Sequence, residues 1–357
     1  MQRWTGVTGW QVRRHPALVP LSSSLAPTEV PLHVAPSVVS VTRLPSVDPA
    51  ARPSVVIASA GRLDLLWRAV EALEPERKRT GAQLVIARSA PLAQEALVRE
   101  RLGDATIVWS PPGAGIPRLR GMGLAAATGD PVAITEDHLV AGDGWLEHLF
   151  KHARDGVDIV GGGMQNRVGS NAVAWAAYLS DYGFYSYARP ATSVLVPLLT
   201  MANMAYRRRD VPRIAEWCSA GAWENVVHDR LAAEGRTLTF APEARIIHDH
   251  SYRFAEFLKN RYEHGWDYAR ARLTENPKAL RLPLIAMTPV LPLILLFRIA
   301  KAASGEDRGA FLRALPLTVA FLYAWAAGEA FGYLRGPIQP GEELGRVIDA
   351  SLGGPLL

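Results

Sequence analysis

Two acids and a histidine, Glu136, Asp137 and His138, come directly after the apolar stretch 131–135. Carboxylate oxygens and an imidazole nitrogen form a ligand set that suits a Mg²⁺ or Mn²⁺ ion bridging a diphosphate. The alternative is that Asp137 caps the next helix and that the acids belong to its first turn. That helix is expected to begin later, near Gly144, which favours the interpretation as a site.

Alternating patterns along residues 53–135 indicate the elements that position this triplet. Short apolar runs predict strands at 54–58, 84–87, 106–109 and 131–135, and apolar residues at helical spacing predict helices over 63–73, 92–102 and 117–127. Strands that alternate with such helices form right-handed crossovers and a mainly parallel, doubly wound α/β sheet of Rossmann-like type. Ligands of these sheets bind at the carboxyl ends of the strands, which is where the triplet lies.

The composition of the chain limits its size class and its partners. A length of 357 residues predicts either one large domain with an appendage or two domains. The hydrophobic share of 49% and the charged share of 20% support a sizeable core and argue against global disorder. The formal charge of +5 fits nucleotides, phosphates or an acidic membrane surface as partners. Nucleic acid is not expected, because no basic run with interleaved aromatic residues is present.

Cys218 is the only cysteine, which excludes an intrachain disulfide and a cysteine-based zinc cluster and favours a reducing compartment. The N-terminus contains arginines but no continuous apolar core, since Pro16 and Pro20 interrupt it, and no export signal is expected. Residues 1–52 are predicted to be an extended, Pro-rich lead-in with one edge strand around 38–41.

Four blocks of the sequence occur in the order and spacing of a known enzyme family. They are SVVIASAGRLDLLWRAVEAL from residue 54, IPRLRGMGLAAATGDPVAITEDHLVAGDGWL from residue 116, NMAYRRRDV from residue 203, and WENVVHDRLAAEGRTLTFAPEARIIHDHS from residue 223. Over about residues 53–275 the chain resembles the inverting family 2 glycosyltransferases of the GT-A fold, with TEDH as a variant of their metal motif. The resemblance implies a catalytic domain at 53–253, in which two strands and a histidine follow the helix that begins near Glu224.

The resemblance places a nucleotide-sugar donor between the loop at 58–62 and the triplet at 136–138. Two arginines of the third predicted helix are placed for contact with the diphosphate, because a guanidinium pairs with phosphate oxygens in a forked geometry. The alternative for these arginines is a solvated helix face. The donor-binding residues implied in this way are Ser59, Arg62, Arg118, Arg120, Glu136 and Asp137.

A divalent cation, Mn²⁺ or Mg²⁺, is also implied, with Asp137, His138 and His248 as its ligands. His248 matches the histidine that follows the last core strand in the family, and His250 is a near alternative. The other interpretation of these two histidines is surface placement at the end of a strand. His138 stands where the family has an acid, which leaves the identity of the metal open.

Inversion at the sugar requires a base that removes a proton from the acceptor hydroxyl. The resemblance assigns this role to Glu224 at a helix start, and His228 follows one turn later on the same face, as its support or as the base itself. The alternative for Glu224 is a first-turn acid that interacts favourably with the helix dipole. Trp223 and Asn203 are implied on the acceptor side.

Three departures from the family pattern concern specificity. Asn225 replaces the second acid of the usual pair at the base. The second strand ends with ARS at 87–89, where acids that read the nucleoside are usual, and Met201 and Ala202 precede Asn203 in place of a glycine. The sequence therefore leaves recognition of uridine open, and the acceptor loop is expected to differ from that of the family.

Residues 254–280 are predicted to form an amphipathic helix with positive charge on its polar side. Packing on the catalytic core and binding at a membrane interface remain equal alternatives for this helix. The apolar stripe consists of Phe254, Phe257, Leu258, Tyr262, Trp266, Ala269 and Leu273.

Two apolar segments, 282–297 and 314–334, predict a hydrophobic helical hairpin over 281–336, followed by a tail at 337–357. The first segment is short for a bilayer span and contains three prolines, and the second contains Glu329. The loop between them is basic, which disfavours its export if the catalytic domain faces the cytoplasm. A hairpin that dips into the membrane or lies along it avoids this conflict, and a buried helical pair in a larger soluble fold is the alternative.

These features together predict a cell-membrane glycosyltransferase whose catalytic domain faces the cytoplasm. The expected reaction moves a sugar, with inversion, from a nucleotide donor onto a hydroxyl of a lipid-linked or cell-envelope acceptor. A catalytically lapsed nucleotide-sugar-binding or scaffold protein of the same fold is the first alternative. A different nucleotide-sugar or nucleotidyl enzyme on the same sheet is the second, because a fold does not fix a function.

Overall fold

The computed structural model describes residues 52–167, 169–188, 199–275, 281–303 and 306–339. The lead-in expected over 1–52 and its strand near 38–41 lie outside these residues, apart from Arg52. Most of the tail expected at 337–357 also lies outside them.

Eight strands form one sheet in the order β3-β2-β1-β4-β7-β6-β8-β5. The half that begins the chain is parallel throughout, because β1 pairs with β2 and β4, and β2 pairs with β3, all in parallel register. The strand bounds are β1 Ser54–Ser59, β2 Gln83–Ser89, β3 Thr106–Ser110, β4 Val132–Glu136, β5 Leu139–Ala141, β6 Ile159–Asn166, β7 Asn203–Tyr206 and β8 Leu238–His248.

The second half of the sheet is mixed. Strand β7 runs antiparallel to both β4 and β6, whereas β6 and β8 are parallel, and β5 pairs with β8 in antiparallel register. The α/β, Rossmann-like prediction is confirmed by this sheet, with antiparallel pairs added on one side. All four strands predicted between residues 54 and 135 are present, each within two residues of its expected bounds.

The prediction of two strands after the helix at Glu224 is wrong, because one strand, β8, runs through the whole segment. Its pairing with β6 shifts between Gly162 and Met164, which face Ala241 and Ile246 respectively. The extra β8 residues, which include Pro242, form an irregularity in the ladder and do not end the strand. Pro242, which in the sequence indicates the end of a strand, is thus accommodated in a bulge of β8.

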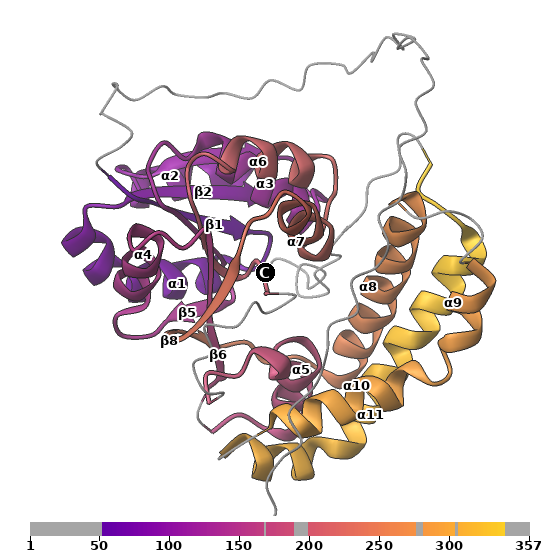
Figure 1. The fold of residues 1–357 in the computed structure, drawn as a ribbon. Helices are drawn as coiled ribbons and strands as arrows, with labels where there is room; N and C mark the ends of the chain where they lie inside the picture. Colours follow the sequence, from indigo (N-terminus) through magenta and orange to yellow (C-terminus); the bar gives the residue numbers. More distant parts are fainter. Residues whose placement is uncertain (1–51, 168, 189–198, 276–280, 304–305, 340–357) are drawn as a thin grey trace, which may run out of the picture. The chain divides into compact units, whose positions relative to one another are not determined.

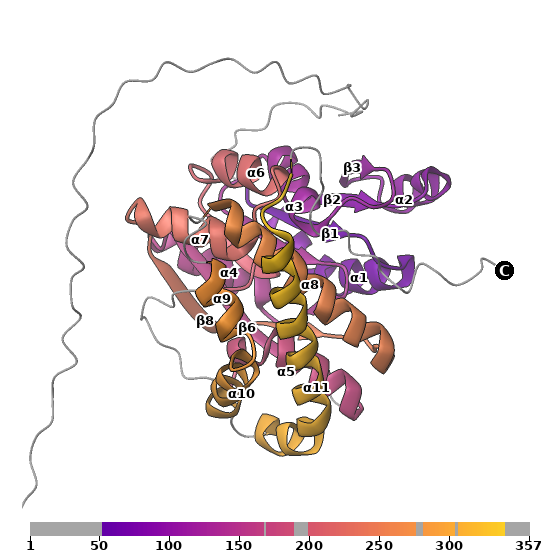
Figure 2. The ribbon, with the colours of Figure 1, turned by 90° about the vertical axis from the view of Figure 1, so that its right-hand side faces the viewer.

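Helices cover both faces of the sheet and enclose two separate cores (Figures 1 and 2). Residues of α1 and α4 pack in the core on one face, and residues of α3, α6 and α7 pack in the core on the other. The helix predicted over 92–102 begins with a 3₁₀ turn at Leu92–Gln94. The helix bounds are α1 Leu63–Thr80, α2 Glu95–Arg101, α3 Ile116–Ala126, α4 Trp145–Arg154, α5 Ala172–Asp181, α6 Val211–Ser219 and α7 Glu224–Ala233, with a second 3₁₀ turn at Gly183–Tyr185.

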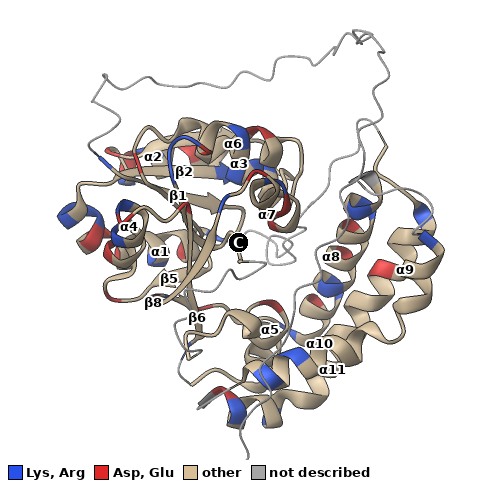
Figure 3. Ribbon diagram, viewed as in Figure 1, with Lys and Arg blue, Asp and Glu red and all other residues tan. Residues whose placement is uncertain are grey.

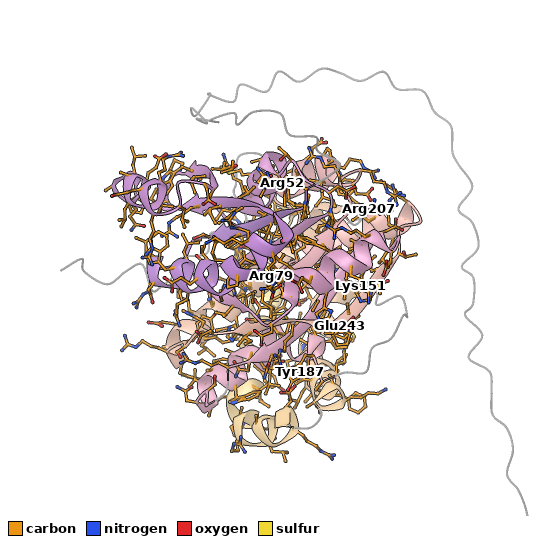
Figure 4. All side chains as sticks on the ribbon, turned by 90° about the vertical axis from the view of Figure 1, so that its left-hand side faces the viewer. Arg52, Arg79, Lys151, Tyr187, Arg207 and Glu243 are labelled. Carbon is orange, nitrogen blue, oxygen red and sulfur yellow. The ribbon has the colours of Figure 1, made fainter. Side chains whose placement is uncertain are left out.

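The surface around α1 and α4 is polar. Charged side chains such as Arg79 and Lys151 are exposed there (Figure 4). Arg79 of α1 forms an ion pair of 2.9 Å with Glu147 of α4. This side of the molecule therefore presents the solvated surface that is usual for a globular domain.

The remaining helices, α8 Phe254–Glu275, α9 Arg281–Met287, α10 Leu291–Ala302 and α11 Glu306–Arg335, follow the sheet in the sequence. Among the described elements, α8 and α11 form the most extensive contact, and α11 also packs on α5. By length and composition, α11 is long and apolar enough to cross a membrane over Asp307–Arg335, and α9 with α10 forms a second candidate that is bent by 63°. Along its apolar stretch, α11 carries a single charged residue, Glu329 (Figure 3).

Glycines bring α8 and α11 into backbone contact. A Cβ atom added to Gly328 would lie 2.0 Å from the carbonyl oxygen of Tyr262, and one added to Gly265 would lie 2.2 Å from that of Trp325. Gly332, one turn beyond Gly328, would meet the carbonyl oxygen of Trp266 at 2.6 Å. Small residues at this spacing allow two helices to approach more closely than ordinary side chains permit.

We expect Gly328→Ala to lower the free energy of unfolding by about 1–3 kcal/mol, because the new methyl group must push α11 away from α8. Urea unfolding of the full chain in detergent measures this change. The matched variant is Gly309→Ala in the same helix, where the added Cβ meets only a flexible arginine end at 3.6 Å. It should leave stability unchanged or raise it by up to about 1 kcal/mol, since alanine is the better helix former. Equal losses in both variants would contradict the close approach.

Candidate active site

A cavity of about 480 Å³ opens at the carboxyl ends of the parallel strands. The triplet contributes to it as expected, because Glu136 ends β4 and the next two residues precede β5. Helix α4 begins only at Trp145, so the acids do not belong to its first turn. Of the residues that the sequence singled out, the cavity is lined by Arg120, Glu136, Asp137, His138, Trp223, Glu224 and His250.

Arg120 joins the triplet to the candidate base. Its guanidinium donates to Glu136 Oε1 at 2.5 Å and to Glu224 Oε2 at 2.9 Å. The side chains of Arg120 and Glu136 are 4% and 8% exposed, whereas that of Glu224 is 24% exposed and faces the cavity. One buried cation thus holds the end of β4 against the start of α7.

Electrostatics within this group favour the charged forms. Burial alone would raise the pKa of Glu136, but the charge of Arg120 outweighs it, and the pKa lies below its usual value. Burial likewise acts against the charged form of Arg120, yet Glu136 and Glu224 raise its pKa further. The group is therefore a cation shared by two carboxylates, and it carries one net negative charge.

Asp137 is held by the first strand and its loop. Its Oδ2 atom accepts hydrogen bonds from Ser59 Oγ at 2.8 Å and from the Gly61 backbone N–H at 2.9 Å. Arg88, at the end of β2, donates to Ser59 Oγ and to the Gly61 carbonyl, and its Nη1 atom lies 4.0 Å from Asp137. Burial raises the pKa of Asp137 despite these partners. The arginine that replaces the expected nucleoside acids therefore organises the loop at the donor end of the cavity.

The ring of His138, with aromatic side chains next to it, lies beside the Oδ1 atom of Asp137. The His138 Nδ1 atom lies 3.6 Å from Glu136 Oε2 and 3.9 Å from Asp137 Oδ1, and its Nε2 atom hydrogen bonds to Tyr182 Oη at 3.1 Å. The His138 ring meets the rings of His248 and His250 edge to face at 5.7 Å and 6.3 Å. In this conformation, no three His, Cys, Asp or Glu side chains among the described residues are close enough to hold a metal ion.

His248 lies behind His138 and does not line the cavity. Its Nδ1 atom is 3.3 Å from Asn166 Oδ1, and burial lowers its pKa well below the usual value. A neutral imidazole is the form that binds metals. His248 is therefore in the protonation state of a metal ligand, although its ring does not line the cavity in this conformation. The alternative interpretation of His248 as a surface residue is wrong, because this residue is 1% exposed.

His228 contacts the core and not Glu224. Its Nε2 atom is 3.0 Å from Tyr206 Oη, and its buried Nδ1 atom has no hydrogen-bond partner within the described parts of the chain. Burial, with a smaller effect from Arg120, lowers its pKa to about 3. Glu224 and His228 are one turn apart on α7, but their side chains face different surroundings. His228 therefore does not contact Glu224 in the way that the spacing suggested.

Three other predicted residues lie outside the cavity. Arg62 is exposed and donates to Asp64 at 2.8 Å, and Arg118 is exposed on α3, on the side of the helix opposite to Arg120. Asn203 is buried at the start of β7, where it accepts from Trp145 Nε1 and donates to the carbonyls of β6 and β8. Arg118 therefore lies on an exposed helix face, which was the alternative given for it. Asn203 has a structural role, because its hydrogen bonds connect β7 to β6 and β8.

Sequence reasoning did not identify several residues that line the cavity from the C-terminal helices. They come from α8, α10 and α11, and the helical spacing of the first group was read only as an amphipathic pattern. These residues are Asn260, Arg261, His264, Tyr268, Arg272, Leu291, Leu295, Arg298, Trp325 and Glu329. The spacing of four between residues 260, 264, 268 and 272 was the available signal, since it places them on one side of a helix.

The cavity thus brings together an arginine, paired acids at the end of a strand and a carboxylate at a helix start. Residues 54–214 match the family model described as "Glycosyl transferase family 2". Over these residues the chain is similar to the family 2 glycosyltransferases, and this match supports a glycosyltransferase as its enzyme class.

The chain was also compared with curated proteins and with solved structures. No curated protein matches it in sequence. One similar solved structure is the mannosyltransferase PcManGT from Pyrobaculum calidifontis in complex with GDP-Man and Mn²⁺, at 17% sequence identity and a TM-score of 0.49. The alignment covers 80% of this chain and 89% of that one.

We expect Arg120→Met to lower the free energy of unfolding by about 3–5 kcal/mol, because it leaves the buried Glu136 carboxylate without its partner. Arg118→Met, in the same helix but exposed, should change it by no more than about 0.5 kcal/mol. Denaturant unfolding at pH 7 measures both variants. Similar small effects at the two positions would show that the buried bridge does not contribute to stability.

Proposed function

We propose that the protein transfers a sugar from a nucleotide-sugar donor, with inversion, to a hydroxyl group of a lipid-linked or cell-envelope acceptor. The observation that carries this proposal is the bridge through Arg120, which places the motif acid Glu136 and the candidate base Glu224 on one cavity. A donor diphosphate and an acceptor hydroxyl can then occupy the two sides of the same guanidinium. The family match to residues 54–214 supports sugar transfer as the reaction class.

In this proposal, the donor lies over the loop after β1, with its diphosphate facing Arg120. The diphosphate competes with both carboxylates for this guanidinium, because phosphate oxygens form the same forked pairing. Gly61 and Asp137 line the donor end, and the buried Ser59 and Arg88 hold them in place. Arg62 and Arg118 have no part in it, since both side chains are exposed away from the cavity.

The chemistry of the side chains around His138 fits a divalent cation. Asp137 Oδ1 and Glu136 Oε2 both face the His138 Nδ1 atom within 4 Å, and the ring of His248 lies beyond. We assign Asp137, His138 and His248 as its protein ligands. When bound, Mn²⁺ or Mg²⁺ would neutralise charge on the departing diphosphate. Oxygens of the donor would complete the ligand set, which the protein alone does not supply.

Glu224 is the proposed base. It is the first residue of α7, its carboxylate faces the cavity, and Trp223 precedes it on the acceptor side. When a donor diphosphate takes up the Arg120 guanidinium, the Glu224 carboxylate is released from its ion pair and can face the acceptor hydroxyl. Donor binding would thereby prepare the base for the acceptor hydroxyl.

The test is release of nucleoside diphosphate from a panel of nucleotide sugars by membranes containing the full chain and a lipid extract. We expect one donor to be consumed, and we expect Glu224→Gln to lower the rate by about 10²–10⁴-fold, as for loss of a general base. Asp229→Asn, an exposed acid of the same helix, should retain the wild-type rate. Unchanged transfer by Glu224→Gln would overturn the base assignment.

The same assay tests the metal and the alternative function. A chelator and the variant His138→Ala should each suppress release, and added Mn²⁺ or Mg²⁺ should reverse only the effect of the chelator. Binding of a nucleotide sugar without release from any donor would instead identify a lapsed binding protein of this fold.

We propose further that α9, α10 and α11 attach the protein to the cytoplasmic face of the cell membrane, lying along its surface. Exposed apolar side chains gather on these helices, in contrast to the charged surface of α1 and α4, and include Leu282, Phe297 and Leu312 at 77%, 70% and 63% exposure. Large apolar side chains exposed in this number on neighbouring helices favour contact with an apolar partner. Helix α11 is packed along α8, which carries several charged residues, and this pairing favours a surface position over a span.

Co-sedimentation with vesicles of anionic phospholipid tests the attachment. The double variant Leu282→Glu with Phe297→Glu should remain in the supernatant, because two charges oppose insertion of the apolar surface. The matched double variant Arg79→Glu with Lys151→Glu changes the polar side of the molecule and should sediment like the wild type. Equal sedimentation of both double variants would contradict the assigned surface.

A further inference from the structure

The cavity extends well beyond the catalytic carboxylates. From Glu224 it continues along α8 to α10 and α11, and ten of its lining residues belong to these three helices: Asn260, Arg261, His264, Tyr268, Arg272, Leu291, Leu295, Arg298, Trp325 and Glu329. The donor end is built from other elements, namely the loop after β1, α3 and the end of β4. A second compartment, next to the base and distant from the donor loop, is therefore part of the same space.

Two buried polar atoms beside the base have no hydrogen-bond partner among the described residues. They are Trp223 Nε1 and His264 Nε2, and their rings are 5.9 Å apart. Burial lowers the pKa of His264 to about 4, so its imidazole is neutral at pH 7 and can either donate or accept. Buried polar groups are normally paired, and two unpaired ones on a cavity wall indicate a ligand that pairs with them.

The same side of α8 continues this polar wall. Asn260, His264, Tyr268 and Arg272 are spaced by four residues and all line the cavity. Arg261 is fixed beside them by an ion pair with Asp181 and by contact with the Trp325 ring. This wall offers an amide, an imidazole, a phenol and a guanidinium, which are groups that recognise hydroxyls and other polar head groups.

In contrast to α8, helix α10 contributes apolar side chains to the cavity wall. Leu291 and Leu295 line the cavity, while Leu293 and Phe297 of the same helix are 58% and 70% exposed on the surface that we assign to the membrane. A single helix therefore separates the compartment from that surface. Leu291 and Leu295 therefore offer an apolar chain a place within the cavity, on the helix that also carries the exposed Leu293 and Phe297.

We propose that this compartment is the acceptor site and that it takes an amphiphile, whose hydroxyl-bearing head pairs with His264 and Trp223 and whose apolar chain lies against Leu291 and Leu295. This assignment rests on the proposed function and specifies its acceptor. The head hydroxyl lies beside Glu224, from which α7 begins, so the proton that it loses has a short path to that carboxylate. The donor sugar reaches the same hydroxyl from the side of Arg120.

Binding of decyl β-glucoside to the full chain in nanodiscs tests the site without any turnover. The probe is titrated below its micelle concentration by calorimetry, with empty nanodiscs as the blank. His264→Phe removes the ring nitrogens at similar size and should weaken binding about tenfold, the loss expected for a buried hydrogen bond. His264→Gln restores a polar atom near the Nε2 position and should recover most of the affinity, which a purely structural role of the ring would not predict.

A matched pair on α10 tests the apolar part. Leu295→Gln faces the cavity and should also weaken binding about tenfold, because a polar amide replaces an apolar contact. Leu293→Gln faces outward and should leave the affinity unchanged. Glucose without its chain should bind far more weakly than the decyl glucoside.

Equal affinities across the four variants, or equal binding of glucose and decyl glucoside, would overturn the proposed site. This result is independent of donor turnover. If the wild type binds the probe in the expected pattern but releases no nucleoside diphosphate, the compartment stands and the proposed reaction fails. If it releases nucleoside diphosphate while the variants bind alike, the reaction stands and the acceptor site is elsewhere.

Discussion

The buried guanidinium of Arg120 is the constraint on which the arrangement of the site depends. A cation with 4% exposure of its side chain needs compensating charge, since an unpaired buried charge costs several kcal/mol. Its two partners come from the end of β4 and the start of α7, which are separated by 88 residues in the chain. Helix α3, β4 and α7 therefore meet at this guanidinium, and in the proposed function it lies between donor and acceptor.

The sheet supports this convergence through its topology. The parallel half places the ends of β1, β2 and β4 side by side, so that Ser59, Arg88 and Asp137 form one connected group. The antiparallel β7 then reverses the direction of the sheet beside β4, and β8 returns to end at His248. Residues from opposite ends of the catalytic domain thus reach the same edge of the sheet.

The sequence allowed the parallel half of the sheet to be predicted closely, because each strand and helix there has its own local pattern. The continuous β8 was not predictable in this way, since Pro242 resembles a break unless its partner strand β6 is known. Among site residues, the triplet was recognisable because its types and position at a strand end are local properties. Arg118 and Arg120 carry the same side chain two residues apart, and only the packing of α3 decides which one faces the cavity. Arg88 and His264 were missed because their roles depend on contacts with segments far away in the chain.

The close contact between α8 and α11 holds together the cavity wall beyond Glu224. A boundary at residue 253 is natural by sequence, because the sheet is complete there. A chain cut at that point would contain all eight strands and the residues of the bridge through Arg120, but it would lose Phe257, Phe311 and Phe321 from the core on the sheet. It would also lose His264, Leu295 and Glu329 from the wall beyond Glu224. The apolar C-terminus is thus more than an attachment that can be removed to make the enzyme easier to handle. Shortened forms that remain soluble and bind nucleotide would be poor guides to the reaction of the intact protein.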